Sequence, residues 1–110
     1  MLELIGDWEQ NEDRRAIFLS CYAQMTANML QAVAQREFHD AEWVEDLIAH
    51  FADYYFHALE AHEWGLAPTP RPWLVAFDAA QDPQVHVMQH LLLGVNAHIN
   101  YDLCFAVEDA

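Results

Sequence analysis

The sequence contains no lysine, and its four arginines stand against 18 Asp and Glu residues, so the formal net charge is −14. A chain with so few cations lacks the basic patch that binds nucleic acid, because that binding depends on neutralising phosphates. Anionic membrane surfaces are disfavoured as partners for the same reason. We therefore expect neither a nucleic acid nor a membrane among the partners of this protein.

Glycine and proline are also scarce, with three and four residues among 110. Few turns and a hydrophobic content of 55% favour long helices over many short strands. A chain of this length has room for one domain with its own core. The expected fold is therefore all-α: a single domain over residues 1–110, built as a compact bundle of three long helices and one short helix.

Cysteine is too rare for a disulfide framework. Cys21 and Cys104 both fall inside expected helices, where we predict buried thiols. Residues 1–10 are acidic, without the basic region and long apolar run of a signal peptide. This segment is expected to be a loose lead-in, and the protein is expected to be cytoplasmic.

Two long helices are predicted in the first 65 residues. Apolar residues recur at helical spacing over residues 14–35 and again over 41–64. Asp40 is a suitable N-cap for the second helix, and Gly65 suits its C-terminal stop.

The second half of the chain predicts a short helix and a long one. A proline-rich connector is followed by a short helix over 73–80, with Trp73, Leu74 and Phe77 directed inward. Asp82 is expected to cap the last long helix, and Pro83 to open it.

The last helix, Val85 to Val107, is apolar all round, which is typical of a central helix buried on every side. Four polar side chains interrupt it: Asn96, His98, Asn100 and Asp102. Burying such groups costs several kcal/mol unless each finds a partner. They are therefore the first candidates for a functional site.

His98 and Asp102 are four residues apart, which places them on one side of the same helix. One interpretation is a structural hydrogen bond between helices, in which case Asp102 should raise the pKa of His98. A second is catalytic: His98 is a general base oriented by Asp102. A third makes both residues metal ligands, and a catalytic zinc would then need a third ligand from another helix, with His50 and His57 as candidates.

Asn96 and Asn100 share a different face of the helix. Their side chains either fix a connecting loop through hydrogen bonds to its backbone or contribute to a ligand site. Gly94, beside them, allows a close helix–helix approach or leaves space for a ligand.

Tyrosines of the two long helices complete the candidate site. With His98 they would form the polar end of a pocket for a small, largely apolar molecule, and they are Tyr22, Tyr54 and Tyr55. The alternatives are a structural module that assembles with a second copy of the chain, or a metal-dependent hydrolase-like site. The sequence identifies no cofactor and does not decide whether the protein is an enzyme.

Four motifs together resemble those of a bacterial family catalogued as a domain of unknown function. They are FADYYFHAL (Phe51 to Leu59), LLLGVNAHINYDL (Leu91 to Leu103), the F-x-x-x-Y-x-x-x-T spacing that ends at Thr26, and PxPW (Pro70 to Trp73). The resemblance implies an α-helical fold, has the Asn96, His98, Asn100 and Asp102 set as its signature, and implies no activity. It also implies family members that continue beyond the last motif. We therefore expect a shortened member, which lacks a helix or completes its core by pairing with another chain.

A weaker likeness is to zinc-dependent phospholipase C, an all-α enzyme whose ligand helix is similar in its H-x-x-x-D spacing. That site also needs an N-terminal tryptophan and several further ligands, a pattern that Trp8 and the other histidines do not reproduce.

Overall fold

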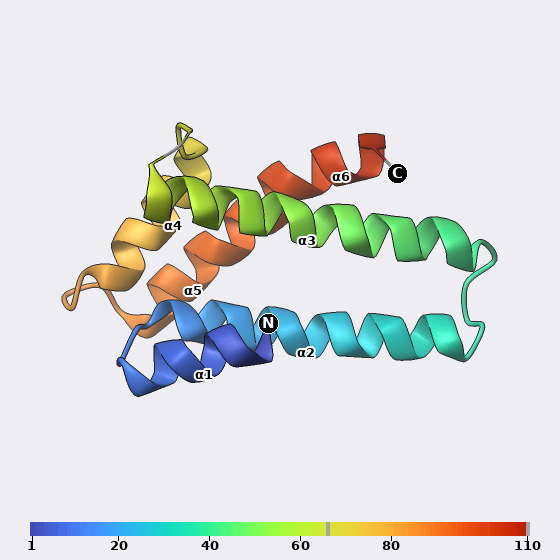
Figure 1. The fold of residues 1–110 in the computed structure, drawn as a ribbon, viewed down its shortest axis with the longest axis horizontal. Coiled ribbons are helices and arrows are strands. Elements are labelled where there is room, and N and C mark those ends of the chain that lie inside the picture. Colours follow the sequence, from blue (N-terminus) through green and yellow to red (C-terminus); the bar gives the residue numbers. More distant parts are fainter. Residues whose placement is uncertain (66, 110) are drawn as a thin grey trace.

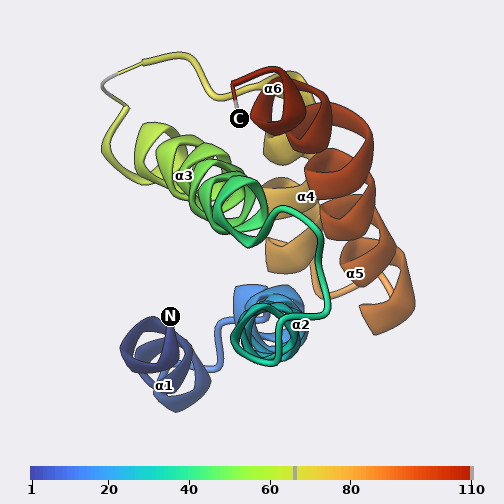
Figure 2. The same cartoon turned by 90° about the vertical axis from the view of Figure 1, so that its right-hand side faces the viewer.

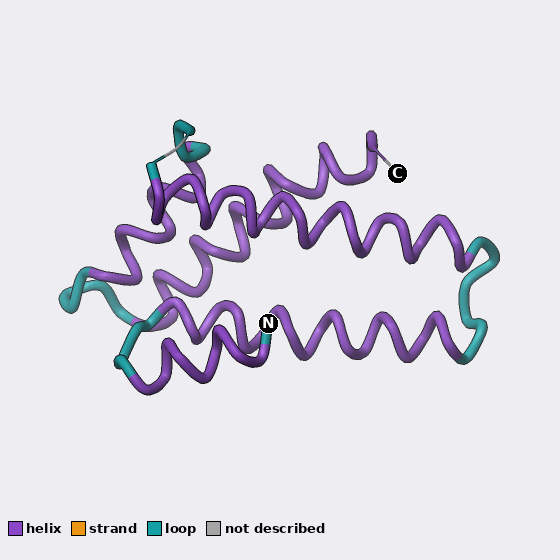
Figure 3. The backbone as a smooth tube through the Cα atoms, in the orientation of Figure 1, coloured by secondary structure: helices purple, strands orange, loops and turns teal. Residues whose placement is uncertain are grey.

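In the computed structural model, residues 1–65 and 67–109 are described, and every regular element among them is helical (Figure 3). The all-α prediction is confirmed. In chain order the elements are α1 (Leu2–Gln10), α2 (Arg15–Ala34), α3 (Ala41–Trp64), α4 (Arg71–Gln81), α5 (Val87–Asn96), η1 (Ala97–Asp102) and α6 (Leu103–Asp109). Since α5, η1 and α6 follow one another without a break, the described part has five helices rather than the expected four.

The additional helix is α1, which we expected to be a loose lead-in. Its apolar residues recur on one face, and Ile5 and Trp8 are buried in the core that α1 shares with α2. The guanidinium of Arg15 lies 4.4 Å from the centre of the Trp8 ring. The prediction failed because acidic residues at the exposed positions of α1 obscured a short amphipathic helix.

Helices α2 and α3 form an antiparallel hairpin, joined at one end by residues 35–40 (Figure 1). Both helices begin and end within one residue of the predicted bounds. The Asp40 carboxylate accepts a hydrogen bond from the Trp43 backbone N–H at 3.0 Å. Gly65 ends α3 with a φ of 67°, in the left-handed region that favours glycine. Both predicted signals are confirmed.

The remaining helices close the other end of the hairpin. α4 and α5 pack side by side across the end where α2 begins, and α6 returns along α3 (Figure 1). Viewed end on, α1 and α5 flank α2 on opposite sides (Figure 2). Within α4, Trp73 and Phe77 are buried as expected, but Leu74 is exposed.

The last long helix begins at Val87, not at Pro83. The His86 ring accepts a hydrogen bond from the Met88 backbone N–H, and the Gln89 side chain accepts one from the His86 backbone N–H. This reciprocal capping box satisfies two donors at the helix start. Asp82 instead caps a preceding turn through the Gln84 backbone N–H, so the predicted cap was wrong.

This helix is not buried on all sides. The α5 part packs against α4, η1 contacts α3 and α4, and α6 packs against α3, whereas another side of the helix faces outward. The outward apolar residues are Val87, Met88, Leu92, Val95, Ile99, Phe105 and Val107. The prediction that this helix is buried on all sides was wrong, because an exposed apolar helix face and a core-facing one show the same spacing of apolar residues in the sequence. Cys21 and Cys104 are likewise exposed free thiols, not buried ones.

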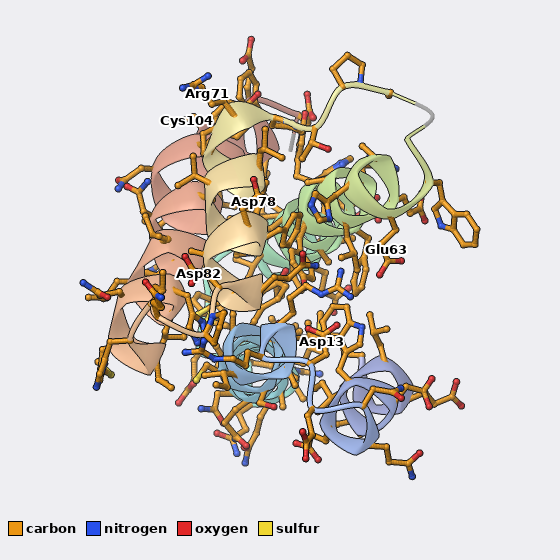
Figure 4. All side chains as sticks on the ribbon, turned by 90° about the vertical axis from the view of Figure 1, so that its left-hand side faces the viewer. Asp13, Glu63, Arg71, Asp78, Asp82 and Cys104 are labelled. Atoms are coloured by element: carbon orange, nitrogen blue, oxygen red, sulfur yellow. The ribbon has the colours of Figure 1, made fainter. Side chains whose placement is uncertain are left out.

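Two of the four arginines join separate elements. The guanidinium of Arg14 donates to the backbone carbonyls of Asp82 and Val85 at 2.8 and 2.7 Å, which fixes the α4–α5 connection to the start of α2. Arg15 forms ion pairs with Asp13 and Glu63, whose positions are labelled in Figure 4. In the described ranges, no helix combines the length and apolar character that a membrane crossing requires.

Candidate functional site

The centre of the candidate site is a π-helical turn, η1, which spans Ala97–Asp102. In a π-helix the backbone hydrogen bonds join residues five apart, whereas in an α-helix they join residues four apart. Such turns occur frequently at functional sites. The turn carries both His98 and Asp102 and directs their side chains into the core. No local pattern in the sequence predicts this turn, because the helical spacing continues through residues 97–102.

Three side chains form a buried hydrogen-bonded chain. Asp102 Oδ2 accepts from Trp73 Nε1 at 2.8 Å and lies 2.9 Å from His98 Nδ1. The exposed fractions of Trp73, His98 and Asp102 are 1%, 2% and 1%. Asp102 therefore joins η1 to the first turn of α4 and fixes the orientation of the His98 ring.

Burial dominates the protonation of His98. It lowers the pKa of the imidazole, and it outweighs the hydrogen bond and charge of Asp102, which act to raise the pKa. The predicted rise in pKa was therefore wrong, because we did not weigh the desolvation of the charged ring. A neutral ring that donates from Nδ1 to a carboxylate has its lone pair on Nε2, an assignment that follows from the hydrogen bond.

Aromatic rings enclose this imidazole. Phe51 of α3 stacks on it with a centroid distance of 3.6 Å and an interplanar angle of 3°, and Tyr22 of α2 approaches it edge-on at 4.3 Å. Among the described residues, neither His98 Nε2 nor the Tyr22 hydroxyl makes a hydrogen bond of good geometry, although both are buried, and the neighbouring Thr26 hydroxyl interacts with that of Tyr22 closely enough to act to lower the pKa of Tyr22. Burial also raises the pKa of Tyr22, so its hydroxyl keeps its proton. The site thus holds an imidazole nitrogen and a phenol hydroxyl, on two rings that contact each other, neither of which makes a hydrogen bond of good geometry within the described residues.

A mostly apolar pocket of about 200 Å³ adjoins Tyr22, between α2, α3, η1 and the start of α6. Tyr22 and Phe51, which both contact the His98 ring, are part of its wall. The hydroxyls of Tyr22 and Thr26 are the polar groups of a lining that otherwise includes Met25, Met29, Leu47, Ile48, Ile99 and Leu103. An apolar cavity of about 150 Å³ is enough to hold benzene, so this pocket matches a molecule of one ring.

The two other tyrosines of the predicted site lie at different places. Tyr55 is buried, with its ring centre 6.1 Å from that of His98, but it lines a separate small cavity of about 20 Å³. Tyr54 lines another pocket, formed by α3, η1 and α6. The structure therefore places Tyr22 and Tyr55 near His98, and Tyr54 apart from it.

Asn96 and Asn100 are exposed, and they bond to each other: Asn100 Nδ2 donates to Asn96 Oδ1 at 2.7 Å. The expected bonds to loop backbone are absent from the described contacts of this pair. Gly94 allows a close approach between α5 and Phe18 of α2, as predicted.

Sequence reasoning missed Trp73 and Phe51 as parts of the site and assigned both to the core. For Trp73 there was a usable signal, since a buried indole N–H needs an acceptor, and Asp102 is a carboxylate in an otherwise apolar helix. Over residues 1–65 and 67–109, no group of three or more His, Cys, Asp and Glu side chains is arranged to hold a metal. His50 and His57 therefore do not join His98 and Asp102 in a ligand set.

A sequence profile for a family of unknown function (DUF5995) matches residues 1–110. The chain belongs to this family. The match agrees with the expected membership of a family of unknown function and assigns no activity. The searches of curated proteins and of solved structures give no match. The function has to be argued from the site itself.

Proposed function

We propose that the protein binds a small, largely apolar molecule of about one ring in the pocket between α2, α3 and η1. The observation that carries this proposal is an apolar pocket lined by Tyr22, whose buried hydroxyl makes no hydrogen bond of good geometry, with the unpaired Nε2 of His98 on a ring that Tyr22 and Phe51 contact. Leaving such atoms unpaired costs roughly 1–3 kcal/mol each. A ligand with one hydroxyl or N–H group would recover part of that cost.

The chemistry of the polar end favours a ligand with a hydrogen-bond donor. A neutral imidazole held by a carboxylate presents Nε2 as an acceptor and, for a suitable substrate, as a general base. His98 Nε2 is itself buried and its ring contacts Phe51 and Tyr22, so a ligand donor reaches Nε2 only if one of these neighbours moves. Binding and a catalytic role would thus both place the ligand donor at His98 Nε2. The experiment below tests binding.

The test is an NMR titration of the protein with benzene and with phenol, which differ by one hydroxyl. The variant Ile99→Phe places extra volume on a residue that lines the pocket, and it should weaken both ligands. The matched control is Val95→Phe, one turn earlier on the same helix, equally exposed and outside the pocket lining. Tyr22→Phe should weaken phenol by roughly fivefold to tenfold, the value of one hydrogen bond, and leave benzene unchanged.

Two outcomes of this titration would contradict the binding proposal. If neither compound shifts the resonances of pocket residues at millimolar concentration, the pocket is only a packing defect. Equal effects of Ile99→Phe and Val95→Phe would also place the bound molecule elsewhere.

A second candidate function is association of two copies of the chain through the outward side of α5, η1 and α6. Between Val85 and Val107 the only charged residue is Asp102, which is buried, in a chain with a net charge of −14. The exposed Asn96–Asn100 pair has both a free N–H and a free carbonyl oxygen, so it could bond to its own copy across a two-fold axis.

Sedimentation velocity tests this second function over a range of concentrations. Leu92→Glu should produce a monomer, because it places a charge in the apolar side. Leu2→Glu, at an exposed apolar position on α1, is the control and should not change the mass. A wild-type protein that stays monomeric at high micromolar concentration rejects the function.

A further inference from the structure

A second pocket lies on the other side of Asp102, between α3, η1, α6 and the segment that leads into α4. Its volume is about 300 Å³, and it shares no lining residue with the pocket beside Tyr22. The described residues around it include Ala58 and Ala61 of α3 and Pro70, which precedes α4. Nothing in the function proposed above uses this space.

Three aromatic rings line this second pocket, one from each helical element. The ring of Phe105, on α6, lies 5.8 Å from that of Tyr54 on α3 and 5.1 Å from that of Tyr101 on η1. Tyr54 is fixed by a hydrogen bond from its hydroxyl to the Asp109 carboxylate, which also raises the pKa of Tyr54 to about 12. The faces of aromatic rings carry negative partial charge, so a group of them attracts cations.

The buried Asp102 carboxylate is part of the same wall. Both of its hydrogen bonds, from Trp73 and His98, go to Oδ2. Across the described contacts, Oδ1 accepts no bond. The two donors are an indole N–H and a neutral imidazole N–H, so they orient the carboxylate without cancelling its charge. Because Asp102 is almost fully buried, that charge acts with little screening by water.

The charges around the pocket also favour a cationic ligand. Among the described residues that line it, none is an arginine and His57 is the only basic side chain. Asp109, bound to Tyr54, adds a second carboxylate at the rim. A metal ion would need several oxygen ligands, and the lining does not supply them. A neutral apolar molecule would leave Oδ1 of the buried carboxylate without a partner.

We propose that this second pocket binds an organic ammonium ion, with the cationic nitrogen between Asp102 and the rings of Tyr54, Tyr101 and Phe105. The carboxylate supplies charge, the rings supply cation–π contacts, and the alanine and proline residues accept the alkyl groups. Asp102 then has two roles: it orients His98 on one side and recognises a cation on the other.

The experiment is a protein-observed NMR titration of the full chain with choline and with 3,3-dimethylbutan-1-ol, its neutral isostere. Choline should shift the resonances of Tyr101, Phe105 and Asp102, and the neutral isostere should bind at least about tenfold more weakly. Phe105→Leu should weaken choline by about threefold to tenfold, since it removes one ring of the three. Added salt should weaken choline and leave the isostere unchanged.

The control for lost aromatic surface is Trp43→Leu, because Trp43 and Phe105 are both 39% exposed and Trp43 lies outside the pocket. It should not change choline binding. Asp102→Asn keeps an acceptor for Trp73 and removes the charge, and it should abolish the preference for choline over the isostere. If that variant does not fold, Phe105→Leu still decides. Equal binding of the two compounds, no binding of choline at tens of millimolar, or equal effects of Phe105→Leu and Trp43→Leu would each overturn the proposal.

Discussion

Replacing Gly94 by alanine tests how tightly α5 packs on α2. A Cβ atom at position 94 would lie 2.9 Å from Cδ2 and 3.0 Å from Cγ of Phe18, closer than real contacts allow. The Phe18 ring cannot easily move away, because it packs against Tyr55, Trp73 and His98 at centroid distances of 5.5–5.9 Å. Overpacking a core costs about 1–3 kcal/mol, whereas the higher helix propensity of alanine returns about 1 kcal/mol.

The clash involves a partly buried ring that is held by its aromatic neighbours, so we expect the upper part of that cost and a net loss of about 1–2 kcal/mol in the free energy of unfolding. Urea denaturation measures it directly, and the melting temperature should fall by several degrees. Gly6→Ala is the matched control. It lies within α1, and a Cβ there would meet nothing within 4 Å, so that variant should gain up to about 1 kcal/mol.

A second variant tests the contact between position 94 and Phe18 directly. Phe18→Ala removes Cγ and Cδ2, the two atoms that a Cβ at position 94 would meet most closely, so Gly94→Ala should cost much less in that background than in the wild type. If Gly94→Ala instead stabilises the protein as Gly6→Ala does, the close approach of α5 to α2 is not fixed, and the packing around His98 is looser than described.

Three further outcomes are expected. Trp73→Phe removes the indole donor to the buried Asp102 carboxylate and should lower the free energy of unfolding by about 2–3 kcal/mol in urea titrations, whereas unchanged stability would show that this bond is not needed. Burial lowers the pKa of His98 and of His90 below the ordinary 6.5, so the unfolded chain binds protons more readily, and stability should be full above pH 6.5 and fall as the pH drops below it. In His98→Gln that fall should be smaller, and an identical pH profile would contradict the assignment. Both thiols are exposed and should react with Ellman's reagent in the native protein, whereas reaction only after unfolding would contradict the packing of α2 and α6.

Local signals in the sequence were sufficient to predict the bounds of α2 and α3, the two helices of the hairpin. Its bounds depend on caps and stops that act within a few residues, such as Asp40 and Gly65, and on apolar spacing over many turns. The pairing of His98 with Asp102 was also predictable, because residues four apart meet on any helical turn.

Features that depend on tertiary contacts were not predictable. Nothing local distinguishes an apolar face that meets another helix from one that faces outward, as at Leu92 and Ile99. The direction of the pKa shift at His98 depends on how completely the ring is desolvated, which is set by Phe51 and Tyr22 from other helices. The partner of Asp102 on α4 is 29 residues away in the chain.

The π-turn has a consequence for how one helix serves two neighbours. α5 packs against α4, while α6 packs against α3. Because a π-turn holds one extra residue, everything after Asp102 is rotated by about 100° relative to an uninterrupted α-helix. The rotation acts as a change of register: the same continuous helix presents one set of side chains to α4 and another to α3. Deleting a single residue within 97–102 would remove the rotation, so α6 would turn its apolar side chains away from α3, and Phe105 would leave the ring group that it forms with Tyr54.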